Sequence, residues 1–365
     1  MKQEGYMKIK ISMLLILLLL FVGCAGDEDD EGGEVMNDSD NAGAVDDTPE
    51  LPDDDTAGPS DDRPEERPDE DKGSFCFAGG ALLYENEQQF IPCGSGEGKF
   101  QRQICQNGKF VNAGDCISGL VDIPASEFMM GCNETLESKC NQDNVPQHTV
   151  RVSAFTIDRF EVTVALFEAC IEAGACTNGN ADEPQYRTSE DTDSCNIGNP
   201  DRANHPVNCV TWYGAKALCE WRGMRLPTEA EWETAAKSGK PQIYPWGNSP
   251  AASCDVAVMR SSANGCGFNS TFPIGSKPAG ATENGLYDMA GNVAEFTNDW
   301  YLAGFYSTDE ASQDDTQGPG EPDQNAFKVV RGGSYIYGDD KMRASFRSGA
   351  GMDDSAIDFG FRCVK

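Results

Sequence analysis

The sequence predicts an α+β domain with much irregular structure, preceded by a small disulfide-rich β module. Three observations support this fold class. Three short helical patterns occur between residues 155 and 239. After the third pattern, only short apolar runs remain, separated by long stretches dense in Gly, Asn, Asp and Trp. Before all of these, residues 74–117 place four cysteines among short alternating runs.

The helical patterns carry clear start signals. In "FTIDRFEVTVALFEACIEAG" a strand precedes a helix that Thr163 caps. In "TWYGAKALCEWRG" Thr211 is the cap and Gly223 the terminator. In "RLPTEAEWETAAKSG" Thr228 and Glu231 have the spacing of a capping box, which predicts a third helix.

The N-terminus has the pattern of a secretory signal. Three lysines precede the apolar stretch 11–22, which is too short for a membrane span, and "FVGCAGD" follows. The sequence around Cys24 resembles the lipobox of bacterial lipoproteins, which predicts residues 1–23 as signal peptide and Cys24 as the lipidated residue. The alternative is an ordinary cleaved signal with Cys24 incidental. Ala25, and not an aspartate, stands directly after Cys24, which favours the outer membrane over the inner one.

Residues 24–73 form an acidic segment. Between Asp27 and Lys72 there are 21 acidic and 3 basic residues, a balance of 21 − 3 = 18 negative charges. The segment has few large apolar residues, so we expect a disordered tether that holds a domain away from a membrane. A cation-binding acidic tail is the alternative. The net charge of −33 argues against nucleic-acid binding.

The cysteines favour disulfides over zinc. The chain has fifteen, and removing Cys24 leaves fourteen, all after residue 75. No C-x-x-C pair occurs, and His148 and His205 are the only histidines of the sequence. Export with an even number of cysteines predicts complete pairing. We also expect Cys254 to pair with Cys266. The four-cysteine module 74–117 would be a spacer or an adhesive element.

From about residue 118 to 365 the sequence reads as one domain. It contains "FMMG", "HPVNCVTWYGAKALCEWRGMRLPTEAEWE", "YPWGN", "NGLYDMAGNVAEF", "VVRGGSY" and "FGFRCV" in this order. Together these motifs resemble the formylglycine-generating enzyme, or sulfatase-modifying factor, family. The resemblance implies a C-type-lectin-like α+β fold with little regular secondary structure and a disulfide between Cys219 and Cys363.

The same resemblance implies that this family's oxidation chemistry is missing. In the enzyme, two cysteines near the end of the chain bind copper, the first three residues after the serine of the GGSY motif and the second five further on. Here these positions hold Tyr337 and, nearby, Met342. Soft thiolates select Cu(I), so copper is not expected. We also expect no catalytic residues.

"GLYDMAGNVAEF" resembles the family's calcium loop. Carried over position by position, Asp288 and Glu295 would supply side-chain oxygens, and Gly291 and Val293 would supply carbonyl oxygens. Oxygen ligands suit calcium at extracellular concentrations. The alternative is a turn held by Asx hydrogen bonds alone.

The C-terminal segment holds the candidate ligand-binding residues. Its arginines could clamp an anion, or they could pair with the nearby Asp339, Asp340, Asp353 and Asp358. Trp300 follows the calcium loop and could be a ligand platform. The candidate set is Arg331, Ser334, Tyr335, Tyr337, Arg343, Arg347 and Trp300.

These observations predict a lipoprotein anchored in the outer membrane, whose C-terminal domain acts as a binding or scaffold module. Its ligand could be a protein, a peptide or a glycan. One alternative is an enzyme of the same family with a different reaction. Another is a periplasmic factor that associates with a sulfatase.

Overall fold

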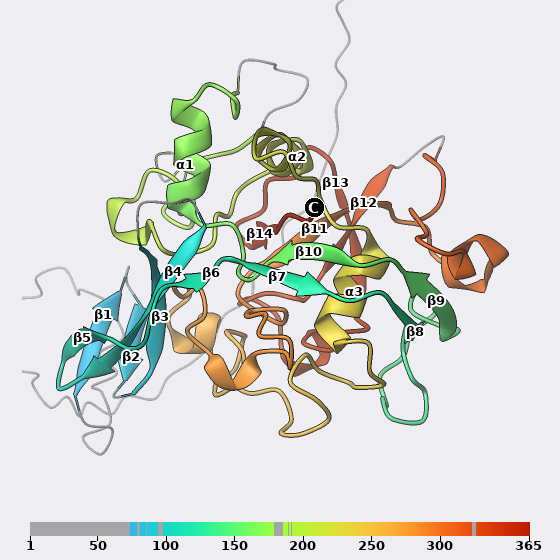
Figure 1. Cartoon of the computed structure of the whole chain (residues 1–365), viewed down its shortest axis with the longest axis horizontal. Coiled ribbons are helices and arrows are strands. Elements are labelled where there is room, and N and C mark those ends of the chain that lie inside the picture. The colour runs from blue at the N-terminus through green and yellow to red at the C-terminus, as the bar shows by residue number, and fades with distance from the viewer. Residues whose placement is uncertain are drawn as a thin grey trace, which may run out of the picture. The chain divides into compact units, whose positions relative to one another are not determined.

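The computed structural model describes residues 74–78, 81–84, 86–93, 98–178, 185–188, 190, 192–322 and 326–365 (Figure 1). The predicted signal peptide, Cys24 and the acidic segment lie outside these residues. All described residues fall in one unit, 66–365.

The four-cysteine stretch forms two small antiparallel sheets, as its alternating runs and turns predict. β1 pairs with β2, and β4 lies between β3 and β5 and also pairs with β6. Disulfides join Cys76 to Cys105 and Cys93 to Cys116. The strands are β1 (Phe75–Ala78), β2 (Ala81–Tyr84), β3 (Gln88–Pro92), β4 (Lys99–Gln106), β5 (Lys109–Asn112) and β6 (Ile117–Ser118).

These strands pack directly onto the rest of the chain. Leu83 is fully buried in a cluster with Val258, Phe272 and Tyr335. The ring of Phe90 lies 4.7 Å from that of Phe160, centroid to centroid. Apolar side chains are thus buried across the boundary expected near residue 118, which a spacer would not require.

Two further antiparallel pairs follow. β7 (Leu120–Ile123) pairs with β10 (Phe155–Asp158), and β8 (Ser126–Met130) pairs with β9 (His148–Val152). Buried and exposed residues alternate along β9, as expected of a strand with one buried face.

The three predicted helices are confirmed with their caps. α1 (Val164–Glu172) and α2 (Trp212–Trp221) begin after Thr163 and Thr211, whose side chains accept backbone N–H bonds. α3 (Glu229–Lys237) begins with the predicted capping box of Thr228. α3 lies against β8, β9, β11 and β12 (Figure 1) and is buried along its whole length.

A four-stranded sheet in the order β13–β12–β11–β14 carries the C-terminal half. β14 runs parallel to β11 and the other pairs are antiparallel. The disulfide Cys219–Cys363, implied by the family resemblance, joins α2 to the residues after β14. The strands are β11 (Ala294–Trp300), β12 (Phe327–Arg331), β13 (Arg347–Gly351) and β14 (Phe359–Gly360).

Short 3-10 turns and loops make up much of the remainder. Regular elements between α3 and β11 are limited to two such turns, as the Gly- and Asn-rich sequence predicts. The 3-10 turns are η1 (Pro200–Arg202), η2 (Gly265–Gly267), η3 (Pro278–Gly280), η4 (Phe305–Ser307), η5 (Asp309–Ser312) and η6 (Asp339–Lys341).

Candidate functional site

The segment after β12 turns sharply at two glycines. Gly332 and Gly333 have φ angles of +87° and +67°, a region that other residues rarely adopt. A Cβ on Gly333 would lie 2.6 Å from the carbonyl oxygen of Lys341. The turn therefore holds residues 334–341 in a tight loop and decides where their side chains point.

The three hydroxyl side chains of this loop differ in exposure. Ser334 is buried, and its Oγ donates to Oδ2 of Asp358 at 2.7 Å. Tyr335 is also buried, and burial, followed by the charge of Asp358, raises its pKa to about 12. Tyr337 is 36% exposed. Of these three, only Tyr337 has a substantial surface for a ligand.

Arg331 and Arg347 lie in a buried ion-pair network beneath the loop. Arg347 binds Glu229 with two bonds, from Nε at 2.6 Å and from Nη2 at 2.8 Å. Arg331 donates to the same carboxylate at 3.1 Å and also to Glu233. Glu233 in turn pairs with Lys237 at 2.7 Å.

Asp299 adds a further carboxyl group at the edge of this network. The backbone N–H of Glu229 donates to Oδ2 of Asp299 at 2.8 Å. Burial, followed by the charge of Glu229, raises the pKa of Asp299 to about 8. Asp299 is therefore largely protonated at neutral pH. The carboxylates that pair with Arg331 and Arg347 are Glu229 and Glu233, both on α3.

The network excludes a ligand-binding role for these two arginines in the folded state. Arg331 and Arg347 are 0% and 2% exposed, so a ligand could not reach them. Of the two alternatives from the sequence, ion pairing holds for both arginines. The aspartates expected as partners because they are nearby in the sequence are wrong. β12 and β13 face α3, which brings Glu229 and Glu233 to the guanidinium groups from about 100 residues away.

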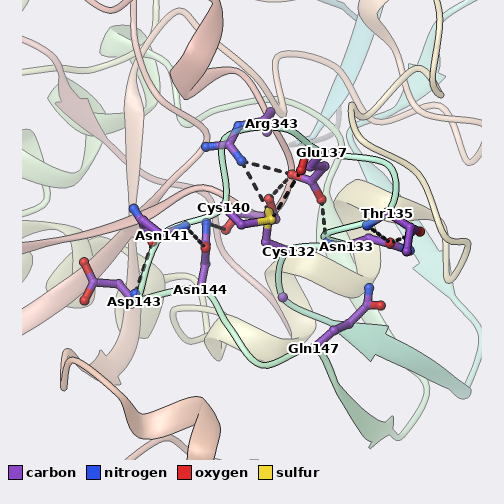
Figure 2. The surroundings of a disulfide bond; sticks show 12 residues. Cys132, Asn133, Thr135, Glu137, Cys140, Asn141, Asp143, Asn144, Gln147 and Arg343 are labelled. Atoms are coloured by element: carbon purple, nitrogen blue, oxygen red, sulfur yellow. Dashed lines mark hydrogen bonds and ion pairs between the residues drawn. A yellow bond between two sulfur atoms is a disulfide. The ribbon is translucent and has the colours of Figure 1, made fainter.

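Arg343 is likewise buried and paired, but with a different loop. Its Nη1 donates to Oε2 of Glu137 at 3.1 Å and contacts Sγ of Cys132 at 3.5 Å (Figure 2). The hydroxyl of Ser345 donates to the same carboxylate oxygen of Glu137. Glu137 belongs to the connection between β8 and β9, so here too the partner is distant in sequence.

Trp300 offers only part of its ring to solvent. The Nζ atom of Lys328 lies 3.5 Å from the centroid of the indole and 4.4 Å from that of Trp212. The same Nζ atom donates a hydrogen bond to the carbonyl oxygen of Asn298 at 2.8 Å. A ligand platform would require Lys328 to leave one face of this ring.

Met342 forms part of the core below Tyr337. It is fully buried in a cluster with Ala257, Met259 and Ala290. The disulfide Cys254–Cys266, expected from the sequence, packs against this cluster. All fourteen cysteines within the described residues are paired, so this part of the chain offers no free thiol near Tyr337 or Met342.

The predicted calcium loop is a tight turn with left-handed residues. Asp288, Gly291 and Asn292 have φ angles of +56°, +81° and +58°. Oδ2 of Asp288 accepts the N–H of Gly275 at 2.6 Å. Both oxygens of Glu295 accept bonds from Arg362 at 2.7 Å.

A third carboxylate, absent from the sequence-based set, lies beside this loop. Glu161 accepts the N–H of Val293 at 3.0 Å and the side-chain N–H of Asn292 at 2.7 Å. Burial, followed by the charge of Asp288, raises the pKa of Glu161 well above its usual range. Burial also raises the pKa of Asp288, to about 6.

This loop could hold a cation only if backbone carbonyl oxygens served as ligands. Three buried carboxyl groups, those of Glu161, Asp288 and Glu295, lie near one arginine, Arg362, and the pKa values of Glu161 and Asp288 are raised. The described residues contain no group of three or more carboxylate, imidazole or thiol side chains around one point. An ion would therefore depend on Asp288 and on carbonyl oxygens, because both oxygens of Glu295 already bind Arg362.

Two surface hollows lie elsewhere. One, of about 360 Å³, involves β8, β9 and Asp315; the other, of about 390 Å³, involves Tyr213, Phe327 and Met352. None of the predicted ligand-binding residues lines either of them. The candidate residues are thus brought together by the fold, but most of them contact each other or the core rather than a cavity.

The comparisons with known proteins agree with this geometry. Residues 110–365 match the Sulfatase-modifying factor enzyme 1-like domain. The formylglycine-generating enzyme of Thermomonospora curvata is 32% identical over 67% of this chain and 93% of its own length. The chain belongs to the sulfatase-modifying factor family.

Other proteins similar to this chain carry different names. Serine/threonine-protein kinase pkn1 of Chlamydia caviae is 34% identical over 67% of this chain, which spans only 38% of the kinase's length. A bovine (Bos taurus) protein named inactive C-alpha-formylglycine-generating enzyme 2 is 35% identical over 45% of this chain and 51% of its own length. The chain is therefore also similar to a protein whose name describes it as inactive.

Solved structures show the same fold. PvdO from Pseudomonas aeruginosa has a TM-score of 0.52 and 23% identity, and covers 67% of this chain and 93% of its own. Treponema denticola variable protein 1 has a TM-score of 0.51 and 23% identity, and covers 76% and 98%. The family's α+β fold with few helices is thus shown for this chain.

The sequence analysis did not single out two buried carboxylates, Glu161 and Glu229. Glu161 stands in "DRFEVT", and Glu229 stands in the first turn of α3. An acidic residue in a first helical turn is normally read as favourable to the helix dipole. Only the tertiary structure, which brings Arg331 of β12 and Arg347 of β13 to α3, shows that Glu229 binds two arginines.

Proposed function

We propose that this chain is an exported, membrane-anchored member of the sulfatase-modifying factor family that binds a partner and does not carry out copper-dependent oxidation. The partner would be a protein, a peptide or a glycan. The family itself is shown by the comparisons; the anchoring and the binding role are the proposal.

The pair of Tyr337 and Met342 carries this proposal. The family resemblance places two copper-binding cysteines at these positions. Tyr337 presents a phenol at the surface, and Met342 is a fully buried thioether. Neither can form the dithiolate that holds Cu(I), and the described cysteines are all in disulfides.

Copper binding and turnover test this proposal together. The oxidised protein and the Thermomonospora curvata enzyme are titrated with Cu(I) against a competing chelator, and both are then given a sulfatase-motif peptide in air. We expect binding and turnover only from the enzyme. Conversion of the peptide by this chain would overturn the proposal.

The variant Tyr337→Cys sharpens the test. We expect it to stay inactive, because the second thiolate is still missing and Met342 lies in the core. A pull-down with the same peptide, immobilised, tests whether the chain associates with sulfatases. Retention of the wild-type chain above a scrambled peptide would support that partner class.

We further propose that calcium binds the loop 288–295. Asp288 and the carbonyl oxygens of Gly291 and Val293 would hold it, and its charge would offset the buried carboxylates. For an affinity of roughly 0.1–1 mM, 5 mM calcium should stabilise the fold by about 1–2 kcal/mol. Thermal unfolding with calcium, magnesium or chelator measures this, and Asp288→Asn should abolish the calcium effect.

The anchoring proposal rests on residues before the described part of the chain. None of the helices among the described residues has the length and apolar character to cross a membrane. A lipid on Cys24 would supply attachment to the outer membrane. Mass spectrometry of the mature N-terminus decides this, and an unmodified Cys24 would contradict it.

A further inference from the structure

One disulfide of the domain has a cation against its sulfur. Cys132 and Cys140, eight positions apart in the sequence, are joined in the connection between β8 and β9. Nη1 of Arg343 lies 3.5 Å from Sγ of Cys132 (Figure 2).

The two sulfurs of this bond differ in access. Cys132 is fully buried, whereas Cys140 is half-buried at the end of the loop. The loop residues between them are mostly exposed, and Glu137 is the buried exception. A nucleophile from solvent therefore meets Cys140 first, and the sulfur that would leave points toward Arg343.

The buried half of the loop is firmly held. The N–H of Cys132 donates to the carbonyl oxygen of Asn144 at 2.7 Å. Gly131, the residue before it, donates to Glu233 at 2.7 Å and accepts from Lys237 at 2.9 Å. Cys132 would thus stay beside Arg343 if its bond to Cys140 were broken.

We propose that Cys132–Cys140 is a thiol-exchange site whose substrate is a thiol compound. The thiolate sulfur of the substrate bonds to Sγ of Cys140, and the Sγ–Sγ bond breaks with its electron pair on Cys132. The products are a mixed disulfide at Cys140 and a thiolate at Cys132. No electrons are gained or lost overall, and no other reactant is needed.

The charges around the leaving sulfur favour this direction of exchange. A cation beside a cysteine stabilises its thiolate, and a stabilised leaving thiolate speeds exchange. Glu137 holds the guanidinium in place but also opposes the new negative charge. Lys139, on the same loop, is exposed and pairs with Asp339 at 3.7 Å, so Arg343 is the cation in contact with the sulfur.

The first measurement locates the reaction. The folded, oxidised protein is incubated with increasing glutathione, quenched with acid and mapped by peptide mass spectrometry. We expect the glutathione adduct on Cys140 at a concentration about tenfold below that which opens Cys170–Cys176. That control also closes a short loop, but both its cysteines are buried. An adduct on Cys132, or simultaneous opening of both bonds, would overturn the proposal.

Two variants separate leaving-group stabilisation from simple loosening of the loop. Glu137→Gln removes the opposing charge but keeps an acceptor, so exchange should become faster. Adding Arg343→Met to that variant should slow exchange on the order of tenfold. If loop opening alone limited the rate, the double variant would react at least as fast as Glu137→Gln, and the proposal would fail. A cysteine peptide in place of glutathione, giving the same Cys140 adduct, would extend the substrate class to protein thiols.

Discussion

The disulfide Cys219–Cys363 should contribute more stability than a short disulfide of equal burial. It closes a separation of 144 residues, whereas Cys170–Cys176 closes one of 6. All four cysteines are 0–1% exposed, so alanine substitution of either pair removes a similar buried volume. The difference between the two double variants therefore isolates the length of the closed loop.

Chain entropy sets the expected magnitude. A loop of about 145 residues restricts the unfolded chain by about 5 kcal/mol and one of about 7 residues by about 2.4 kcal/mol. The nested Cys254–Cys266 link shortens the long loop by about 11 residues, which changes the first value by only about 0.1 kcal/mol. Cys219→Ala/Cys363→Ala should thus cost about 2.7 kcal/mol more than Cys170→Ala/Cys176→Ala.

Urea unfolding with the other disulfides intact measures this difference. The free energies are compared at equal slope, because a changed slope would signal a more compact or expanded unfolded state. A difference below about 1 kcal/mol, or one of opposite sign, would refute the loop-length reasoning. Local packing would then dominate both costs.

Three further predictions follow from the buried charges and the module contact. Asp299 has a folded pKa raised to about 8, so the folded state holds a proton that the unfolded state loses from about pH 4, and stability should fall between these pH values. Asp299→Asn should flatten this fall relative to wild type in urea unfolding at pH 5, 7 and 9; parallel curves would contradict the assignment. Glu229→Gln should cost about 3–5 kcal/mol by stranding buried guanidinium groups, against about 1 kcal/mol or less for the exposed Glu283→Gln; similar costs would refute the network. Leu83→Ala should destabilise the whole unit by about 2–4 kcal/mol in a single transition, whereas a separate early transition would mean that the module is only a spacer.

Short-range patterns in the sequence determined much of this fold. The caps Thr163, Thr211 and Thr228 each accept from a backbone N–H group three residues further on, so local spacing alone locates the helix starts. The pairing of all fourteen described cysteines agrees with the expectation from an even count and the predicted export. The family motifs supplied the fold and the Cys219–Cys363 pair.

The tertiary structure decided which side chains face a ligand and which face each other. Arg331 and Arg347 are close in sequence to four aspartates, but their partner Glu229 lies about 100 residues earlier. A buried guanidinium takes a carboxylate that the packed elements bring within about 3 Å, because desolvation makes an unpaired charge costly. Strand pairing and the packing on α3 set that distance, and the local sequence does not encode it. The same physical reason explains Glu161 beside the loop 288–295 and Arg343 beside Cys132.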